Sequence, residues 1–304
     1  MSTPTPPANQ VTEEAVALPE SMVSTGGGGS LDAHACNELL LERGGILIGI
    51  VAAPDVGKTT MIAKIYELAL RRKFGSFKFA GSETLRGYEE RCHLSRIASN
   101  RPLPDTPRTR MAAKLNFTHL NLVTSSGKID MIFSDRSGEY FDTVLGRPAE
   151  IINFTELRRS NVILLLVDLA ALAKSPHVPQ SQVRRLFMAM SQHGHLNNKS
   201  VWLVGTKADL MTDPETLARA ENLLAEMTSE LAQRTKEGER TTVRQIVTSS
   251  RRNLATGEAG QGLERLLEEI VGTPLPQNFM TEQVWPKELN ELDALMYPYR
   301  SKSQ

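Results

Sequence analysis

A short apolar run, a turn and a helix-like pattern follow one another in the stretch IGIVAAPDVGKTTMIAKIYELA, residues 48–69. The turn matches the pattern Gly-x-x-x-x-Gly-Lys-[Ser/Thr], except that Ala52 stands at the first glycine. In such a turn the backbone N–H groups and the N-terminus of the following helix surround a phosphate group. The stretch therefore predicts a strand–turn–helix unit that holds a nucleotide phosphate.

The residues of this turn have distinct expected roles. Gly57 would let the backbone approach the phosphates closely, Lys58 would neutralise the β- and γ-phosphates, and Thr59 would bind Mg²⁺. Lys58 is for the same reason a candidate catalytic residue. We expect the nucleotide contacts of the turn to come from Asp55, Val56, Gly57, Lys58, Thr59 and Thr60.

Strands and helices alternate through most of the chain. Apolar runs and alternating patterns predict strands at 45–53, 114–123, 128–134, 161–169, 201–205 and 243–248. The second and third of these would form a hairpin, and helical patterns occupy the other gaps. This alternation predicts a three-layer α/β fold of the P-loop NTPase type, with a mostly parallel six-stranded sheet and helices on both faces.

The two ends of the chain differ in composition from the middle. Residues 1–42 are rich in proline and glycine, which predicts a flexible low-complexity tail, and the run Gly-Gly-Gly-Gly-Ser at 26–30 also resembles an engineered linker. We expect the P-loop domain to span 43–273. The segment 274–304 is too short for a domain and would be a tail that docks on this core or on a partner.

Two later segments favour guanine as the base. Thr206, Lys207 and Asp209 match the pattern [Asn/Thr]-Lys-x-Asp at the end of a predicted strand. The aspartate can accept hydrogen bonds from the ring N1–H and the exocyclic amino group of guanine, which adenine does not offer in that arrangement. Ser249 and Ser250 end the next strand, where the backbone N–H of Ser250 would reach the guanine carbonyl oxygen.

A third segment supplies a candidate metal ligand. Asp135 and Gly138 match Asp-x-x-Gly after an apolar strand, so that Asp135 would hold Mg²⁺ and the N–H of Gly138 would contact the γ-phosphate. Asp168, which also ends an apolar strand, is a rival metal ligand of the kind found in ATPases. We prefer Asp135 because of its glycine and its place after the hairpin, and we expect Asp168 to be a strand-end turn residue.

Composition excludes several classes of protein. The 35 basic residues balance 35 acidic ones, so no overall charge attracts the chain to nucleic acid or to a membrane surface. The two cysteines give neither a disulfide framework nor a metal-binding spacing. No apolar run reaches the roughly 18 to 20 residues that span a bilayer. We therefore expect a cytoplasmic protein without a membrane span.

Together the segments at 52–59, 135–138, 206–209 and 248–250, with a threonine near Pro107, resemble the translation-factor-related (TRAFAC) class of P-loop GTPases over about residues 44–273. The amino-acid sequences of residues 77–109 and of the segment SDRSGEYF further resemble those of the bacterial double-GTPase families. These families occur in multi-gene systems suspected of roles in biological conflict. The resemblance implies a GTP-hydrolysing switch that binds GTP or GDP with Mg²⁺. It also implies protein partners, such as a second GTPase or an activating protein.

Two departures bear on hydrolysis. Glu139 follows Gly138, where small GTPases carry the glutamine that orients the attacking water, which predicts slow hydrolysis without a partner. The second departure is the stretch of about 35 residues, 74–109, between the first helix and the hairpin, which must contain the switch I segment. There Thr109 is favoured over Thr106 as the further Mg²⁺ ligand and catalytic contact, and Arg108 or Arg110 could act as an arginine finger. Two alternatives stay open, namely a P-loop ATPase or kinase that uses Asp168, and a nucleotide-binding scaffold with negligible hydrolysis.

Overall fold

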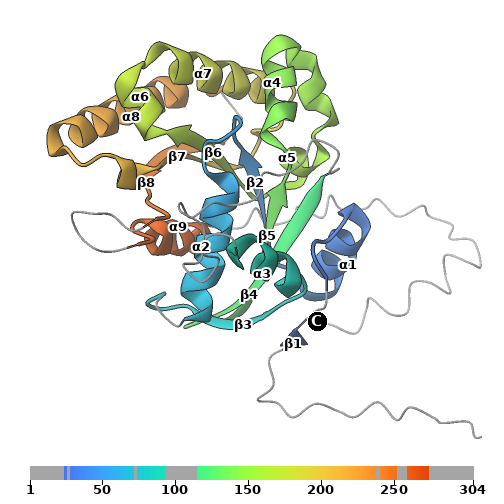
Figure 1. Cartoon of the computed structure of the whole chain (residues 1–304). Coiled ribbons are helices and arrows are strands. Elements are labelled where there is room, and N and C mark those ends of the chain that lie inside the picture. Colours follow the sequence, from blue (N-terminus) through green and yellow to red (C-terminus); the bar gives the residue numbers. More distant parts are fainter. Residues whose placement is uncertain are drawn as a thin grey trace, which may run out of the picture.

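The computed structural model describes residues 24–25, 28–71, 74–93, 115–236, 240–251 and 259–273. Within these residues a single eight-stranded sheet runs in the order β1-β3-β4-β5-β2-β6-β7-β8 (Figure 1). Among the described strands, β4 alone runs antiparallel to its neighbours. The strands are β1 Ser24–Thr25, β2 Ile46–Val51, β3 Lys78–Ser82, β4 Asn116–Thr124, β5 Gly127–Asp135, β6 Val162–Asp168, β7 Ser200–Thr206 and β8 Thr242–Val247.

Helices fill the connections between these strands, except for the tight turn between β4 and β5. The longest helix begins at Pro214, and Asp213 caps it by accepting a bond of 3.0 Å from the Thr216 N–H. The helices are α1 Ala33–Arg43, α2 Lys58–Leu70, α3 Leu85–His93, α4 Gly138–Gly146, α5 Thr155–Arg159, α6 Leu169–Lys174, α7 His177–Gln192, α8 Pro214–Gln233 and α9 Leu263–Gly272, with the 3₁₀ turns η2 Pro148–Asn153 and η3 Ala208–Leu210.

Both faces of the central strands are buried against helices. Side chains alternate along β6, so that Leu164 and Leu166 join a core formed with α2, α3 and α9, whereas Ile163 and Leu165 join a second core formed with α4 to α8. In Figure 1 the two groups of helices lie on opposite sides of the sheet. β5, β2, β6, β7 and β8 are neighbours and run parallel, so their carboxyl ends share one edge of the sheet and the loops that follow them lie on the same side.

The structure corrects two expectations. The predicted count of six strands is too low, because β3 pairs with β4 and the two-residue β1 pairs with β3. Residues 33–42, expected in a flexible tail, belong to α1. Asp32 caps this helix by accepting a bond of 2.9 Å from the Ala35 N–H, and the helix buries Cys36 and Leu39 in a small core. The expected tail at 274–304 lies outside the described residues.

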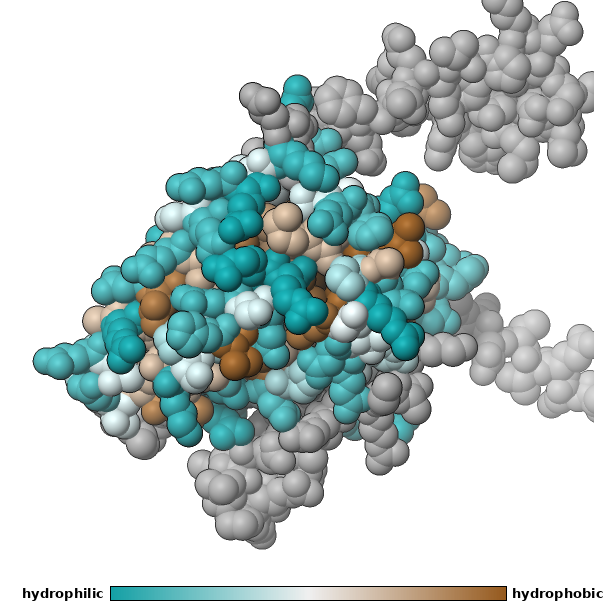
Figure 2. Space-filling view, turned by 90° about the horizontal axis from the view of Figure 1, so that it is seen from above, coloured by the Kyte–Doolittle hydropathy of each residue, from teal (hydrophilic) through white to brown (hydrophobic). Residues whose placement is uncertain are grey.

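The face of the molecule that is seen from above is mostly polar. Figure 2 shows a face that is mainly hydrophilic, with apolar side chains scattered among polar ones. Within the described part of the chain, no helix is long and apolar enough to span a bilayer.

Candidate functional site

The turn between β2 and α2 has the local geometry of an anion-binding site. Gly57 precedes the first helical residue with a φ of 101°, a backbone conformation that L side chains rarely adopt, although a Cβ there would have ordinary space. Lys58 begins α2, and Lys58, Thr59 and Thr60 of its first turn line the pocket described below. Such an N-terminus favours negative charge through its backbone N–H groups and its dipole.

Lys58 lies in contact with the predicted metal ligand. Its ammonium group is 2.7 Å from Asp135 Oδ1, and the two side chains are only 8% and 2% exposed. The same ammonium group also donates to the main-chain carbonyl of Arg136. The residues expected to hold phosphate and Mg²⁺ therefore lie together. Binding of a magnesium nucleotide would have to break the ion pair between Lys58 and Asp135.

The Asp-x-x-Gly segment lies against the phosphate turn. Gly138 begins α4, and a Cβ on it would lie 2.6 Å from the backbone nitrogen of Pro54, which leaves no room for any side chain. Glu139 is in the first turn of α4 and lines the pocket. One turn further on, burial and the neighbouring Glu139 carboxylate raise the pKa of Asp142. Glu139 therefore brings a carboxylate to the end of the pocket towards which Lys58 extends.

The Thr-Lys-x-Asp segment is bonded directly to the phosphate turn. The Thr206 hydroxyl, which is buried, is 2.5 Å from the main-chain carbonyl of Val56, to which it donates. Lys207 has a φ of 62°, a left-handed conformation that ends β7 and leads into η3, which contains Asp209. The bond from Thr206 thus fixes the distance between the predicted base-binding aspartate and the predicted phosphate-binding backbone.

Asp168 has structural partners of its own. It ends β6 and caps α6, accepting a bond of 3.0 Å from the Ala171 N–H. Its other carboxylate oxygen is 2.6 Å from the ammonium group of Lys207. Asp168 is not among the residues that line the pocket. It therefore has the position of the strand-end residue that the sequence predicted, and it orients Lys207.

The segment after β8 is held against the end of β7. The N–H of Thr248 donates to the carbonyl of Gly205 at 2.7 Å, and the N–H of Ala208 donates to the carbonyl of Thr248 at 3.4 Å. Ser250 lines the pocket, as expected of a base contact. Ser249 does not line it, because its side chain is buried and only 1% exposed.

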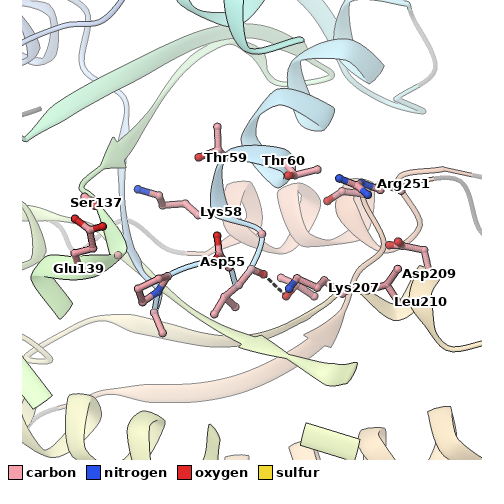
Figure 3. A pocket seen from close by; sticks show the side chains of 17 residues that line it. Asp55, Lys58, Thr59, Thr60, Ser137, Glu139, Lys207, Asp209, Leu210 and Arg251 are labelled. Carbon is pink, nitrogen blue, oxygen red and sulfur yellow. Dashed lines mark hydrogen bonds between the residues drawn. The ribbon is translucent and has the colours of Figure 1, made fainter. Parts of the chain in front are cut away.

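These loops enclose one open cavity of about 390 Å³. Figure 3 shows Ser137 and Glu139 at one end of it and Asp209, Leu210 and Arg251 at the other, with Lys58 extending towards the Glu139 end. The cavity is lined by Ala53, Pro54, Asp55, Val56, Gly57, Lys58, Thr59, Thr60, Ser137, Gly138, Glu139, Thr206, Lys207, Asp209, Leu210, Ser250 and Arg251.

Sequence reasoning missed two residues at the base end of the cavity. Leu210 is 57% exposed despite its size, and Arg251 is also exposed. Leu210 directly follows Asp209, and Arg251 directly follows Ser250. Their positions next to two predicted base contacts were the signal in the sequence that could have identified them. An apolar side chain and a guanidinium group are both suited to contact the face of a flat base.

The expected metal ligands can be compared with the chemistry of Mg²⁺. This ion prefers oxygen ligands and keeps several waters, taking one or two protein ligands beside phosphate oxygens. The Thr59 hydroxyl and the Asp135 carboxylate are such donors, so the donor set fits, provided that Lys58 leaves Asp135. Thr109, Thr106, Arg108 and Arg110 all lie outside the described residues.

Comparison with known proteins gives one family. Residues 46–271 match the model of a family described as Double-GTPase 2, which covers every segment of the site. No match was found among curated proteins.

Proposed function

Because the chain belongs to the Double-GTPase 2 family, we propose that it is a magnesium-dependent, GTP-binding and GTP-hydrolysing molecular switch. The observation that carries the proposal is the hydroxyl bond of Thr206 to the carbonyl of Val56. It supports a single nucleotide that spans the cavity, with its phosphates at the turn and its base at Asp209.

The phosphate end of the cavity supports a triphosphate. The backbone N–H groups at the start of α2 would hold the β-phosphate, and Lys58 would neutralise the β- and γ-phosphates. Gly138 lies against Pro54, where its N–H would contact the γ-phosphate. When bound, Mg²⁺ supplies charge stabilisation for the transferred phosphoryl group, and Thr59 and Asp135 would hold it.

The base end supports guanine. Asp209 would accept from N1–H and the amino group of guanine, and the stem of Lys207, held by Asp168 at 2.6 Å, would cover one face of the ring. The N–H of Ser250 would donate to the guanine carbonyl oxygen. The partners of Asp168 argue against an ATPase or kinase in which it binds the metal, because releasing it would free Lys207 and remove the cap of α6.

We expect slow hydrolysis without a partner. Glu139 can accept a proton from the attacking water but cannot donate to the γ-phosphate, and its charge opposes the negative charge that develops there. An activating protein, or a second GTPase, would supply what is missing. Glu139 also keeps one alternative in view, a nucleotide-binding scaffold with negligible hydrolysis. The role in bacterial conflict that the resemblance implies stays a prediction, as does a cytoplasmic location.

The test is equilibrium binding of labelled GDP, GTP and ATP analogues with Mg²⁺ to the wild type and to Lys58→Ala. We expect guanine nucleotides to bind at least roughly tenfold more tightly than ATP, and the variant to lose them, because Lys58 supplies the cation for the phosphates. Equal binding of ATP would refute the guanine assignment, and no binding at all would refute the switch. Single-turnover GTP decay then separates a slow GTPase from a scaffold.

A further inference from the structure

The side chain of Arg136, inside the Asp-x-x-Gly segment, makes a buried ion pair. Its Nε donates to Glu156 Oε1 at 2.6 Å, and its Nη2 donates to Glu156 Oε2 at 3.0 Å. The two side chains are 11% and 0% exposed. Two parallel bonds between a guanidinium and a carboxylate fix direction as well as distance. Arg136 is not among the residues that line the cavity.

Two aromatic rings complete the surroundings of this guanidinium group. It lies 4.2 Å from the ring centroid of Phe154 and 5.3 Å from that of Tyr140. Phe154 is itself packed against Phe141 of α4 with its ring edge-on, at 5.3 Å between centroids. We call Arg136 with Glu156, Phe154 and Tyr140 the Arg136 clamp. A cation held by a carboxylate and two ring faces has little freedom to change position.

The main chain of the same residue belongs to the candidate site. The carbonyl of Arg136 accepts from the ammonium group of Lys58, and the preceding Asp135 pairs with that group at 2.7 Å. Two residues further on, Gly138 lies against the backbone of Pro54. The clamp therefore holds the turn at 135–138 by its second residue. Asp135, which pairs with Lys58, precedes that residue, and Gly138, the predicted γ-phosphate contact, follows it two positions later.

We propose that the Arg136–Glu156 pair positions the Asp-x-x-Gly turn in advance for the γ-phosphate and thereby sets the preference of the site for GTP over GDP. The inference rests on the proposed function, since it takes Gly138 to be the γ-phosphate contact. Ordering a flexible turn costs entropy on binding, and a turn that is already ordered avoids that cost. GDP makes no γ-phosphate contact, so its affinity depends little on this turn.

The variant that tests the inference replaces both partners. Removing one partner would leave an unpaired buried charge, which is strongly destabilising, whereas replacing a buried pair by apolar side chains of similar volume is often neutral. We therefore choose Arg136→Met with Glu156→Met. The matched control is Arg184→Met with Glu230→Met, because Arg184 makes the same twofold contact with Glu230, at 2.7 and 2.6 Å, between α7 and α8. The control pair is more exposed, at 41% and 31%.

The measurement is the affinity of the full chain for GDP and for a non-hydrolysable GTP analogue with Mg²⁺, after thermal unfolding has confirmed folded variants. We expect the clamp variant to bind the analogue roughly tenfold more weakly and GDP within about twofold of the wild type. Amide hydrogen exchange at residues 136–140 should become faster. The control variant should change neither affinity. If the double variant does not fold, Arg136→Lys, which keeps the charge but loses the twofold contact, should show the same selective loss.

Two results would overturn the inference. A folded clamp variant that binds both nucleotides like the wild type would leave the pair a purely structural role, as would an equal loss for both. In either case the wild type still binds guanine nucleotides and the proposed function stands. A wild type that binds no guanine nucleotide would instead refute the proposed function, and this inference with it.

Discussion

Replacing Asp209 by asparagine should change which base the protein binds. Asp209 lies half-buried in η3 at the base end of the cavity. The carboxylate offers two acceptor oxygens, which match the N1–H and amino groups of guanine. Asparagine has nearly the same shape but offers one acceptor and one donor, so its amide would face the amino group of guanine. Xanthine has a carbonyl in that place, and it fits the amide instead.

The size of the effect follows from the bonds lost. A hydrogen bond to a charged group contributes about 1.5 to 3 kcal/mol, and the half-buried position of Asp209 favours the lower value for each of the two bonds. Asparagine keeps one acceptor for N1–H, so the variant loses the bond to the amino group, leaves two donors facing each other there and removes the charge that strengthens the remaining bond. Together these changes cost about 3 kcal/mol, or roughly a hundredfold in affinity. Asp209→Asn should therefore weaken GDP by roughly that factor and strengthen xanthosine diphosphate.

Calorimetric titration of the wild type and of Asp209→Asn with GDP, xanthosine diphosphate and ADP measures this change of preference. Glu215→Gln is the control, because it removes one negative charge from the first turn of α8 and lies outside the lining of the cavity. An Asp209→Asn protein that keeps the GDP affinity of the wild type and gains none for xanthosine diphosphate would refute the base assignment. It would also return Asp168 as a candidate metal ligand of an ATPase.

Two further predictions concern catalysis and stability. Glu139→Gln should hydrolyse GTP roughly tenfold faster in single-turnover assays, because the amide can donate to the γ-phosphate; slower hydrolysis would instead identify Glu139 as the base. Burial lowers the pKa of Lys199 from 10.5 to about 8, so the unfolded chain binds more protons between those values and the stability of the wild type should rise across this pH window. Denaturant unfolding at pH 8 and 10.5 should show a rise of about 3 kcal/mol relative to Lys199→Met, and parallel pH profiles would contradict it.

The parts of the fold that sequence reasoning found are those with strong local signals. The strand expected at 161–169 is β6, and its buried apolar run depends on residues within that one element. It missed β3, a five-residue strand that contains Gly81 and pairs with β4, a partner distant in sequence. It also missed α1, because the glycine run before it suggested disorder, although Asp32 was available as a capping signal.

The candidate site shows the same division. Motif spacing was enough to name residues at both ends of the cavity, because each lies directly after a strand. The contact between Thr206 and Val56 joins residues 150 positions apart, and the partner of Arg136 is a glutamate in a helix with no motif. Such contacts depend on how elements pack, which the order of residues along the chain does not contain.

The order of strands in the sheet has a consequence for synthesis. β2, which carries the phosphate turn, lies between β5 and β6, and the turn gains its bond from Thr206 only when β7 is in place. Because long-range parallel pairing is slow and pays its loop-closure entropy first, the turn is made early on the ribosome but completed late. A nascent chain that stalls before β7 therefore has the anion-binding turn without the hydrogen bond from Thr206. The proposed nucleotide would therefore stabilise only chains in which β7 has already paired with β6.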